Sequence, residues 1–160
     1  MQRWTIVTSI MFAVLFGESP TAVAQQGING GTYVPTPVVG TWVADLSRSR
    51  LSAPSFKDIT LTISIPAPST VTLTSTLVGT SGESRTVAET FRTDGTETPG
   101  TLSPGVSLLA RWVGPYVLAT LATKAGKPFV LVTYQVSADE KTLTSRSAGF
   151  TEEVVVFTRK

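Results

Sequence analysis

The stretch VVGTWVAD, residues 38–45, combines a short apolar run with a glycine placed two residues before a tryptophan. Valine, threonine and tryptophan favour extended backbone, so the stretch predicts a β-strand that opens the folded domain. The chain closes on a second run of this kind, EVVVFTRK, residues 153–160. We interpret these two runs as the first and last strands of a small antiparallel barrel.

Between the two runs, apolar and polar residues alternate in short segments. In residues 57–65, Ile59, Leu61 and Ile63 share one parity while threonine, serine and aspartate occupy the other. A period of two residues is the signature of a half-buried strand. The same reasoning predicts strands over residues 71–77, 84–92, 106–113, 116–123, 128–136, 141–147 and 153–159.

Turn residues separate these segments at short intervals, with Asp94-Gly95 and Gly114-Pro115 as the strongest signals. About eight or nine strands with hairpin-length connections predict an all-β, antiparallel, up-and-down barrel. Closing such a meander protects its edge strands, and a barrel of this size holds side chains or one small ligand. A β-sandwich built from the same strands is the alternative, and it differs in whether the first and last strands pair.

The N-terminus predicts export. Residues 1–24 have the features of a signal peptide: Arg3, an uncharged apolar run over residues 4–16, and the small-residue cleavage site Ala22-Val23-Ala24. The apolar run is shorter than the ~20 residues of a spanning helix, so cleavage is favoured over a membrane anchor. Residues 25–37 then form a flexible lead, and residues 38–160 form the barrel domain. We expect the mature protein in the periplasm or outside the cell.

Composition excludes several kinds of site. The sequence has no cysteine and no histidine, so disulfides, thiolate metal sites and the commonest general base are ruled out. Thirteen lysines and arginines against eleven acidic residues give a net charge of +2, and the basic residues are scattered. We therefore predict no metal, no cofactor and no nucleic-acid partner.

Carboxylates do not pair in a way that predicts an enzyme. Asp139-Glu140 and Glu152-Glu153 are sequence neighbours, which point to opposite faces of a strand. Glu89 shares its parity with Val87 and Phe91, which would point it inward, but we interpret it as an exposed strand residue. We expect no catalytic residues.

Aromatic and aliphatic residues concentrate on the most apolar predicted strands. The candidates for ligand contact are Trp112, Tyr116, Leu118, Leu131 and Tyr134, with Arg111 as a partner for a carboxylate. Two functions stay open. The chain is either a binding protein for a small apolar or amphipathic molecule, or a non-enzymatic structural or interaction protein whose barrel is filled by these side chains.

Four motifs follow one another in a recognisable order. They are GTW at residues 40–42 followed by DLSRS at 45–49, FRTDG at 91–95 followed by Pro99, SADEKTLT at 137–144, and the aliphatic last strand that ends in Arg159. Together they resemble small exported lipocalin-like, calycin-type β-barrel proteins of bacteria, whose function is unassigned. The resemblance covers residues 38–160, and Glu140 stands where the pattern has a glycine.

The resemblance implies a lipocalin-like barrel with Gly40, Trp42 and Arg159 as its structural signature. In such barrels the first-strand tryptophan packs at the closed end and a late arginine lies against it. The resemblance therefore implies a contact between Trp42 and Arg159, which cation–π attraction would stabilise.

Overall fold

The computed structural model describes residues 37–52, 56–149 and 152–160. Within these ranges the protein is all-β, and its one helical element is a 3₁₀ turn, η1 (Leu46–Arg48). The strands are β1 (Gly40–Ala44), β2 (Phe56–Ala67), β3 (Thr70–Gly79), β4 (Ser84–Arg92), β5 (Thr98–Pro99), β6 (Val106–Trp112), β7 (Val117–Lys124), β8 (Lys127–Val136), β9 (Thr142–Ala148) and β10 (Glu153–Arg159).

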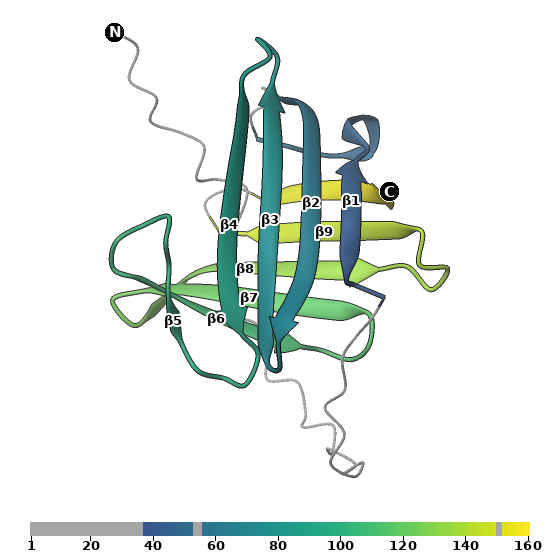
Figure 1. Cartoon of the computed structure of the whole chain (residues 1–160). Helices are drawn as coiled ribbons and strands as arrows, with labels where there is room; N and C mark the ends of the chain where they lie inside the picture. Colours follow the sequence, from purple (N-terminus) through teal and green to yellow (C-terminus); the bar gives the residue numbers. More distant parts are fainter. Residues whose placement is uncertain (1–36, 53–55, 150–151) are drawn as a thin grey trace, which may run out of the picture.

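All ten strands form one antiparallel sheet in the order β4-β3-β2-β1-β10-β9-β8-β7-β6-β5. The first strand pairs with the last, with Trp42 opposite Arg159 and Ala44 opposite Phe157. The sheet curls so that β1 to β4 cross over β6 to β9 (Figure 1). This pairing confirms the predicted barrel over the sandwich. The predicted strand count was low because the two-residue strand β5 lies in a segment rich in glycine and proline.

Side chains bridge the seam between β4 and β5, the two strands at the ends of the sheet order. The Thr98 hydroxyl lies 3.2 Å from the carbonyl oxygen of Thr90 and 3.2 Å from that of Leu108. The Thr101 hydroxyl donates to the carbonyl oxygen of Ala88 at 3.4 Å. The barrel is thus nearly closed: backbone ladders join its other neighbouring strands, and these side chains cover the remaining gap.

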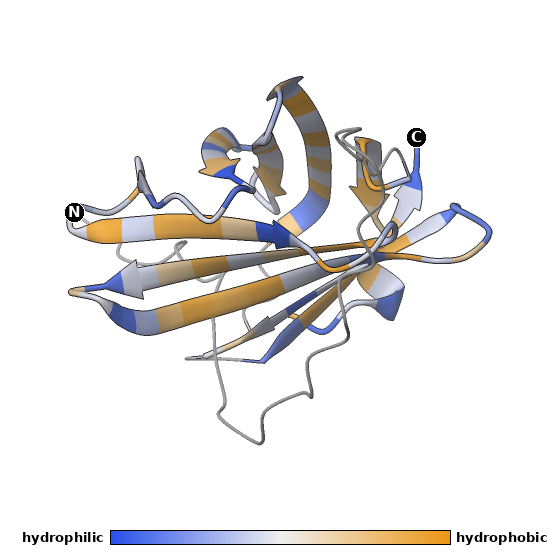
Figure 2. Ribbon diagram, turned by 90° about the horizontal axis from the view of Figure 1, so that it is seen from below, coloured by the Kyte–Doolittle hydropathy of each residue, from blue (hydrophilic) through white to orange (hydrophobic). Residues whose placement is uncertain are grey.

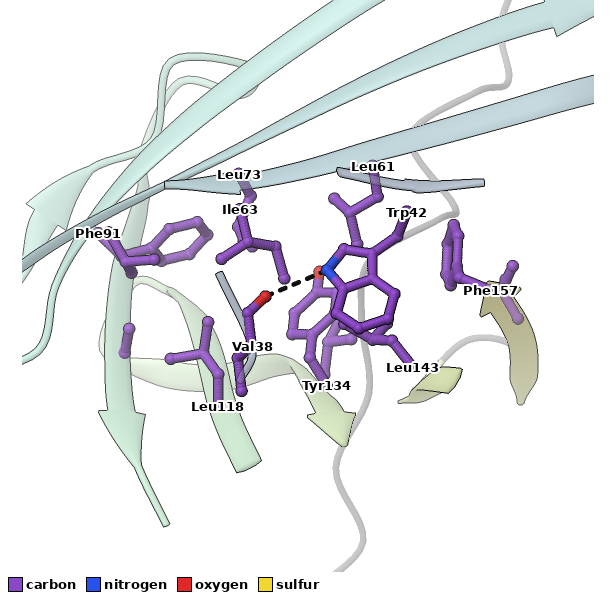
Figure 3. Packing of buried hydrophobic residues seen from close by; sticks show 14 of the residues in the cluster. Val38, Trp42, Leu61, Ile63, Leu73, Phe91, Leu118, Tyr134, Leu143 and Phe157 are labelled. Carbon is purple, nitrogen blue, oxygen red and sulfur yellow. Dashed lines mark hydrogen bonds between the residues drawn. The ribbon is translucent and has the colours of Figure 1, made fainter. Parts of the chain in front are cut away.

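Alternation along the strands builds the core. On β2, Ile59, Leu61 and Ile63 are buried, whereas the residues between them are partly exposed. Figure 2 shows this as hydrophobic and hydrophilic bands that alternate along the strands. The inward residues of both crossing layers meet in one cluster that includes Trp42, Phe91, Leu118, Tyr134 and Leu143 (Figure 3). The inner surface of the barrel is therefore predominantly apolar.

One end of the barrel is fastened by Trp42 and Arg159. The Trp42 indole N–H donates to the carbonyl oxygen of Val38 at 3.1 Å, and Val38 is fully buried (Figure 3). The Arg159 guanidinium lies 4.2 Å from the centre of the Trp42 ring, so the contact that the resemblance implies is present. The same guanidinium donates to the carbonyl oxygens of Val39 at 3.2 Å and of Glu140 at 2.9 Å.

Glu140, which stands where the pattern of the resemblance has a glycine, has a left-handed backbone conformation. Its φ is 59°, in the left-handed region that glycine adopts most easily. Asp139 stabilises this turn, because its carboxylate accepts from the Ser137 hydroxyl at 2.6 Å and from the Lys141 amide at 3.2 Å. The first of these bonds is the main reason that the pKa of Asp139 is lowered.

The predicted signal peptide, residues 1–24, and all but the last residue of the predicted lead lie outside the described residues. Within the part that the structure describes, no helix has the length and apolar character needed to cross a membrane.

Candidate functional site

Polar side chains interrupt the apolar inner surface of the barrel on four neighbouring strands. They are Thr120 on β7, Tyr134 on β8, Ser145 and Ser147 on β9, and Glu153 on β10, and all are buried. Glu153 is the register partner of Ser147, and Tyr134 is the register partner of Ser145. Partners in an antiparallel pair have side chains on one face, about 4.5–5.5 Å apart at Cβ. We call these five residues the inner polar patch.

Two fully buried side-chain oxygens of the inner polar patch have no hydrogen-bond partner in the structure: Ser147 Oγ and Glu153 Oε2. Glu153 is 4% exposed and Ser147 is 6% exposed, so bulk water reaches neither side chain freely. The other carboxylate oxygen, Glu153 Oε1, accepts from the backbone N–H of Ser52 at 3.1 Å and from the Ser52 hydroxyl. Because a buried polar atom without a partner costs about 1–3 kcal/mol, this pair marks where another group could bind.

Glu89 is the second buried carboxylate, which corrects its interpretation as an exposed strand residue. It is 4% exposed and points inward beside Phe91. Both of its oxygens are occupied: the N–H of Thr101 lies 3.1 Å from Oε1 and 3.2 Å from Oε2, and the N–H of Leu102 lies 2.9 Å from Oε1. Two backbone donors satisfy this carboxylate, and parity indicated the inward position correctly. Glu89 therefore links β4 to the residues that follow β5, across the seam between these two strands.

Three of the six predicted ligand-contacting residues come together inside. Leu118 and Tyr134 are buried register partners, and Trp112, the register partner of Leu118, is half-buried and packs against the core. Burial raises the pKa of the Tyr134 phenol, so this side chain stays neutral and can donate a hydrogen bond.

The other three predicted residues lie elsewhere. Tyr116 is 36% exposed in the connection between β6 and β7. Arg111 is exposed and alternates with the buried Ala110, so it lies on the outer face of β6. Leu131 lies between the buried Val130 and Val132, so it also faces outward and cannot contact a molecule held inside.

Apart from Tyr134, the residues of the inner polar patch were not predicted as site residues. Serine and threonine are also the common outward residues of these strands, so their identity carries no signal. Parity along the strand does carry a signal. Ser145 and Ser147 continue the inward positions that begin at Leu143, and Glu153 has the same parity as the inward residues Val155 and Phe157.

No family model matches the sequence, and no curated protein matches it. Solved structures do match. The fatty-acid-binding protein 1 of Echinococcus granulosus superposes with a TM-score of 0.56 at 12% identity, covering 78% of this chain and 98% of that one. A Schistosoma mansoni fatty acid binding protein in complex with arachidonic acid gives 0.53 at 12% identity, covering 81% and 99%. The wild-type fluorescent protein UnaG gives 0.54 at 19% identity, covering 76% and 96%.

The fold is a calycin-type β-barrel. In this calycin-type barrel the inner polar patch can accept hydrogen bonds at Glu153 and can accept or donate them at the hydroxyls. Within residues 37–52, 56–149 and 152–160, no group of three or more acidic side chains is arranged to hold a metal ion. The patch suits the recognition of one polar group at the end of an apolar molecule.

Proposed function

We propose that the chain is an exported binding protein that holds a small apolar or amphipathic molecule inside its barrel. In this proposal residues 1–24 are the leader, residues 25–37 are the lead, and residues 38–160 are the binding domain. One observation carries it: a calycin-type barrel lines its apolar interior with polar atoms that lack partners. An apolar site with a few polar anchors is typical of small-molecule binding. One structural neighbour is a complex with arachidonic acid, which supports the same class of ligand.

Within this proposal Trp112, Leu118 and Tyr134 contact the ligand, because they line one stretch of the inner surface. Arg111 and Leu131 have no such role on the outer face. The fatty-acid-binding neighbours are binding proteins by name, so we propose binding without catalysis.

A neutral dye tests the proposal. Nile red becomes fluorescent in an apolar site, and we expect saturable binding at one dye per barrel. Ala110 is a buried inward residue of β6, so Ala110→Phe occupies the interior and should weaken binding about tenfold or more. Ala119, the register partner of Arg111 on the outer face, supplies the matched control: Ala119→Phe should leave binding unchanged. No dye binding by the wild-type protein would reject the proposal.

A packed barrel that acts by interaction is the second candidate. The fully buried Val38 and Trp42 fill one end together with Leu143 (Figure 3), which reduces the room for a ligand. Native mass spectrometry separates the two candidates. A small molecule carried through purification favours binding, whereas a stable dimer or protein complex without one favours interaction.

Export has its own test. In a bacterial host that recognises the leader, the protein recovered from the cell envelope or medium should begin at Gln25. Its intact mass measures the cleavage site directly, and recovery of the full-length chain in the cytosol alone would contradict export.

A further inference from the structure

We propose that Glu153 and Ser147 select a ligand whose head group is a protonated amine, so that its ammonium group donates hydrogen bonds to them. This inference rests on the proposed binding function and adds the chemistry of the ligand's polar end. The two residues face each other across β9 and β10, and each has a buried oxygen without a partner.

Both side chains have unused hydrogen-bond capacity. An ionised carboxylate only accepts hydrogen bonds, and Glu153 Oε2 has acceptor sites that no group in the structure fills. Ser147 Oγ adds a second acceptor and one rotatable donor beside it. An ammonium group carries three donors and no acceptor, so it complements this pair better than a group that itself needs donors.

The charge of the barrel interior favours the same kind of head group. Among the residues that the structure describes, the buried charged side chains are Glu89 and Glu153, and no lysine or arginine is buried. Glu89 is occupied by the N–H groups of Thr101 and Leu102. A ligand carboxylate at the inner polar patch would meet Glu153 with no buried cation to offset the repulsion, whereas a cationic head would be attracted.

Arg50 lies along β10, next to this end of the barrel. Arg50 bridges to β10 through its backbone, with its N–H 2.7 Å from the carbonyl oxygen of Val154. Its guanidinium, however, lies 3.7 Å from the carboxylate of Glu152, and both of these side chains are largely exposed. Arg50 therefore pairs outside the barrel and leaves Glu153 without a cationic partner. A ligand cation would fill that role.

Three probes with one tail and different heads test the inference: dodecylamine, dodecanol and dodecanoate. Each is titrated at neutral pH, below its micelle concentration, against Nile red bound to the full domain. We expect dodecylamine to bind about tenfold more tightly than dodecanoate. One hydrogen bond to a buried charged group changes a dissociation constant by about this factor. The net charge of +2 acts in the opposite direction, so non-specific attraction does not explain such a preference.

Glu153→Gln should abolish the preference for the amine. Glu152→Gln is the matched control, since it removes the same charge from the adjacent outward residue and should leave the preference intact. Ser147→Ala should reduce the preference for the amine a few-fold. If Glu153→Gln does not fold, the preference measured with Ser147→Ala tests the inference in its place. If dodecanoate binds as tightly as dodecylamine to the wild-type protein, the inference is wrong while the binding function survives. If no probe and no dye binds, the binding function itself fails.

Discussion

Arg159 connects three segments that are distant in sequence. Its guanidinium stacks on Trp42 of β1, and it donates to carbonyl oxygens before β1 (Pro37 at 2.5 Å and Val39 at 3.2 Å) and in the turn after β8 (Glu140 at 2.9 Å). The fixed fork of the guanidinium makes all of these contacts at once. A single residue thus joins the first strand, the last strand and a hairpin turn.

We expect Arg159→Lys to lower the free energy of unfolding by about 1–2 kcal/mol, even though charge is conserved. An ammonium group cannot reach several carbonyl oxygens while lying over the Trp42 ring. Urea titration followed by tryptophan fluorescence measures the loss. Lys160→Arg, at the exposed neighbouring residue, is the control and should change little; equal stability of Arg159→Lys and wild type would contradict this role.

A glycine is required at position 40 for two reasons, namely its backbone conformation and the close approach of Arg159. Its φ is 143°, and a Cβ at this position would lie 2.9 Å from Arg159 Nη1. We expect Gly40→Ala to cost about 1–3 kcal/mol, part of it from the backbone and part from displacing the guanidinium. A double-mutant cycle separates the parts. In an Arg159→Ala background the steric part is gone, so the additional cost of Gly40→Ala should be smaller. A cost that is identical in both backgrounds would show that the guanidinium does not restrict this position.

At the scale of elements, the seam between β4 and β5 is held differently from the rest of the sheet. Glu89 receives the N–H groups of Thr101 and Leu102, which follow β5, and two threonine hydroxyls add bonds across the gap. Side-chain bonds are fewer here than the backbone bonds of a regular ladder. The seam is therefore the part of the barrel that we expect to open first.

Replacing Glu89 tests this account of the seam. In Glu89→Gln the side chain has one acceptor where the carboxylate has two, and its NH₂ group would face donors. We expect the amide protons of Thr101 and Leu102 to exchange about tenfold faster with solvent in this variant. NMR hydrogen exchange measures the effect residue by residue. Glu97→Gln removes a carboxylate at an exposed position in the connection between β4 and β5, and it should leave these amides protected.

The strands themselves were largely predictable, and the reason is the period of two. Ile59, Leu61 and Ile63 identify the inward face of β2, and the pairing of β1 with β10 follows from the need to close a meander. The two-residue β5 was not predictable as a strand, since Pro99 cannot donate a ladder hydrogen bond and glycines surround it.

The candidate site was predicted less completely. Alternation along a strand identifies which residues face inward, but it does not identify the residues that they contact. Leu118 and Tyr134 were placed correctly as neighbours on apolar strands, whereas Leu131 was assigned by hydrophobicity against its parity. Nothing in the sequence near Glu153 reveals that Ser52, about one hundred residues away, occupies only one of its two oxygens. That pairing is decided by how η1 and the chain after it lie along β10.

At the scale of the whole molecule, a barrel without disulfides depends on its core, and Tyr134 makes that core sensitive to alkaline pH. Burial raises the pKa of the Tyr134 phenol in the folded state above the ordinary value near 10. At pH values below that ordinary pKa, the phenol is protonated in both the folded and the unfolded state, and the free energy of unfolding keeps its full value. As the pH rises further the unfolded chain loses the proton while the folded chain keeps it, so the free energy of unfolding falls by about 1.4 kcal/mol per pH unit.

The comparison of wild type with Tyr134→Phe isolates this effect, because lysines that titrate in the same range are common to both proteins. We expect the stability of Tyr134→Phe, from urea titrations between neutral and strongly alkaline pH, to decline less steeply than that of wild type. Tyr116→Phe, at a partly exposed tyrosine, should keep the steep decline. Parallel curves for wild type and Tyr134→Phe would mean that the phenol meets water in the folded protein. The barrel would then be open to solvent at the depth where Leu118 and Tyr134 meet, and the inner polar patch beside Ser145 would be hydrated even without a ligand.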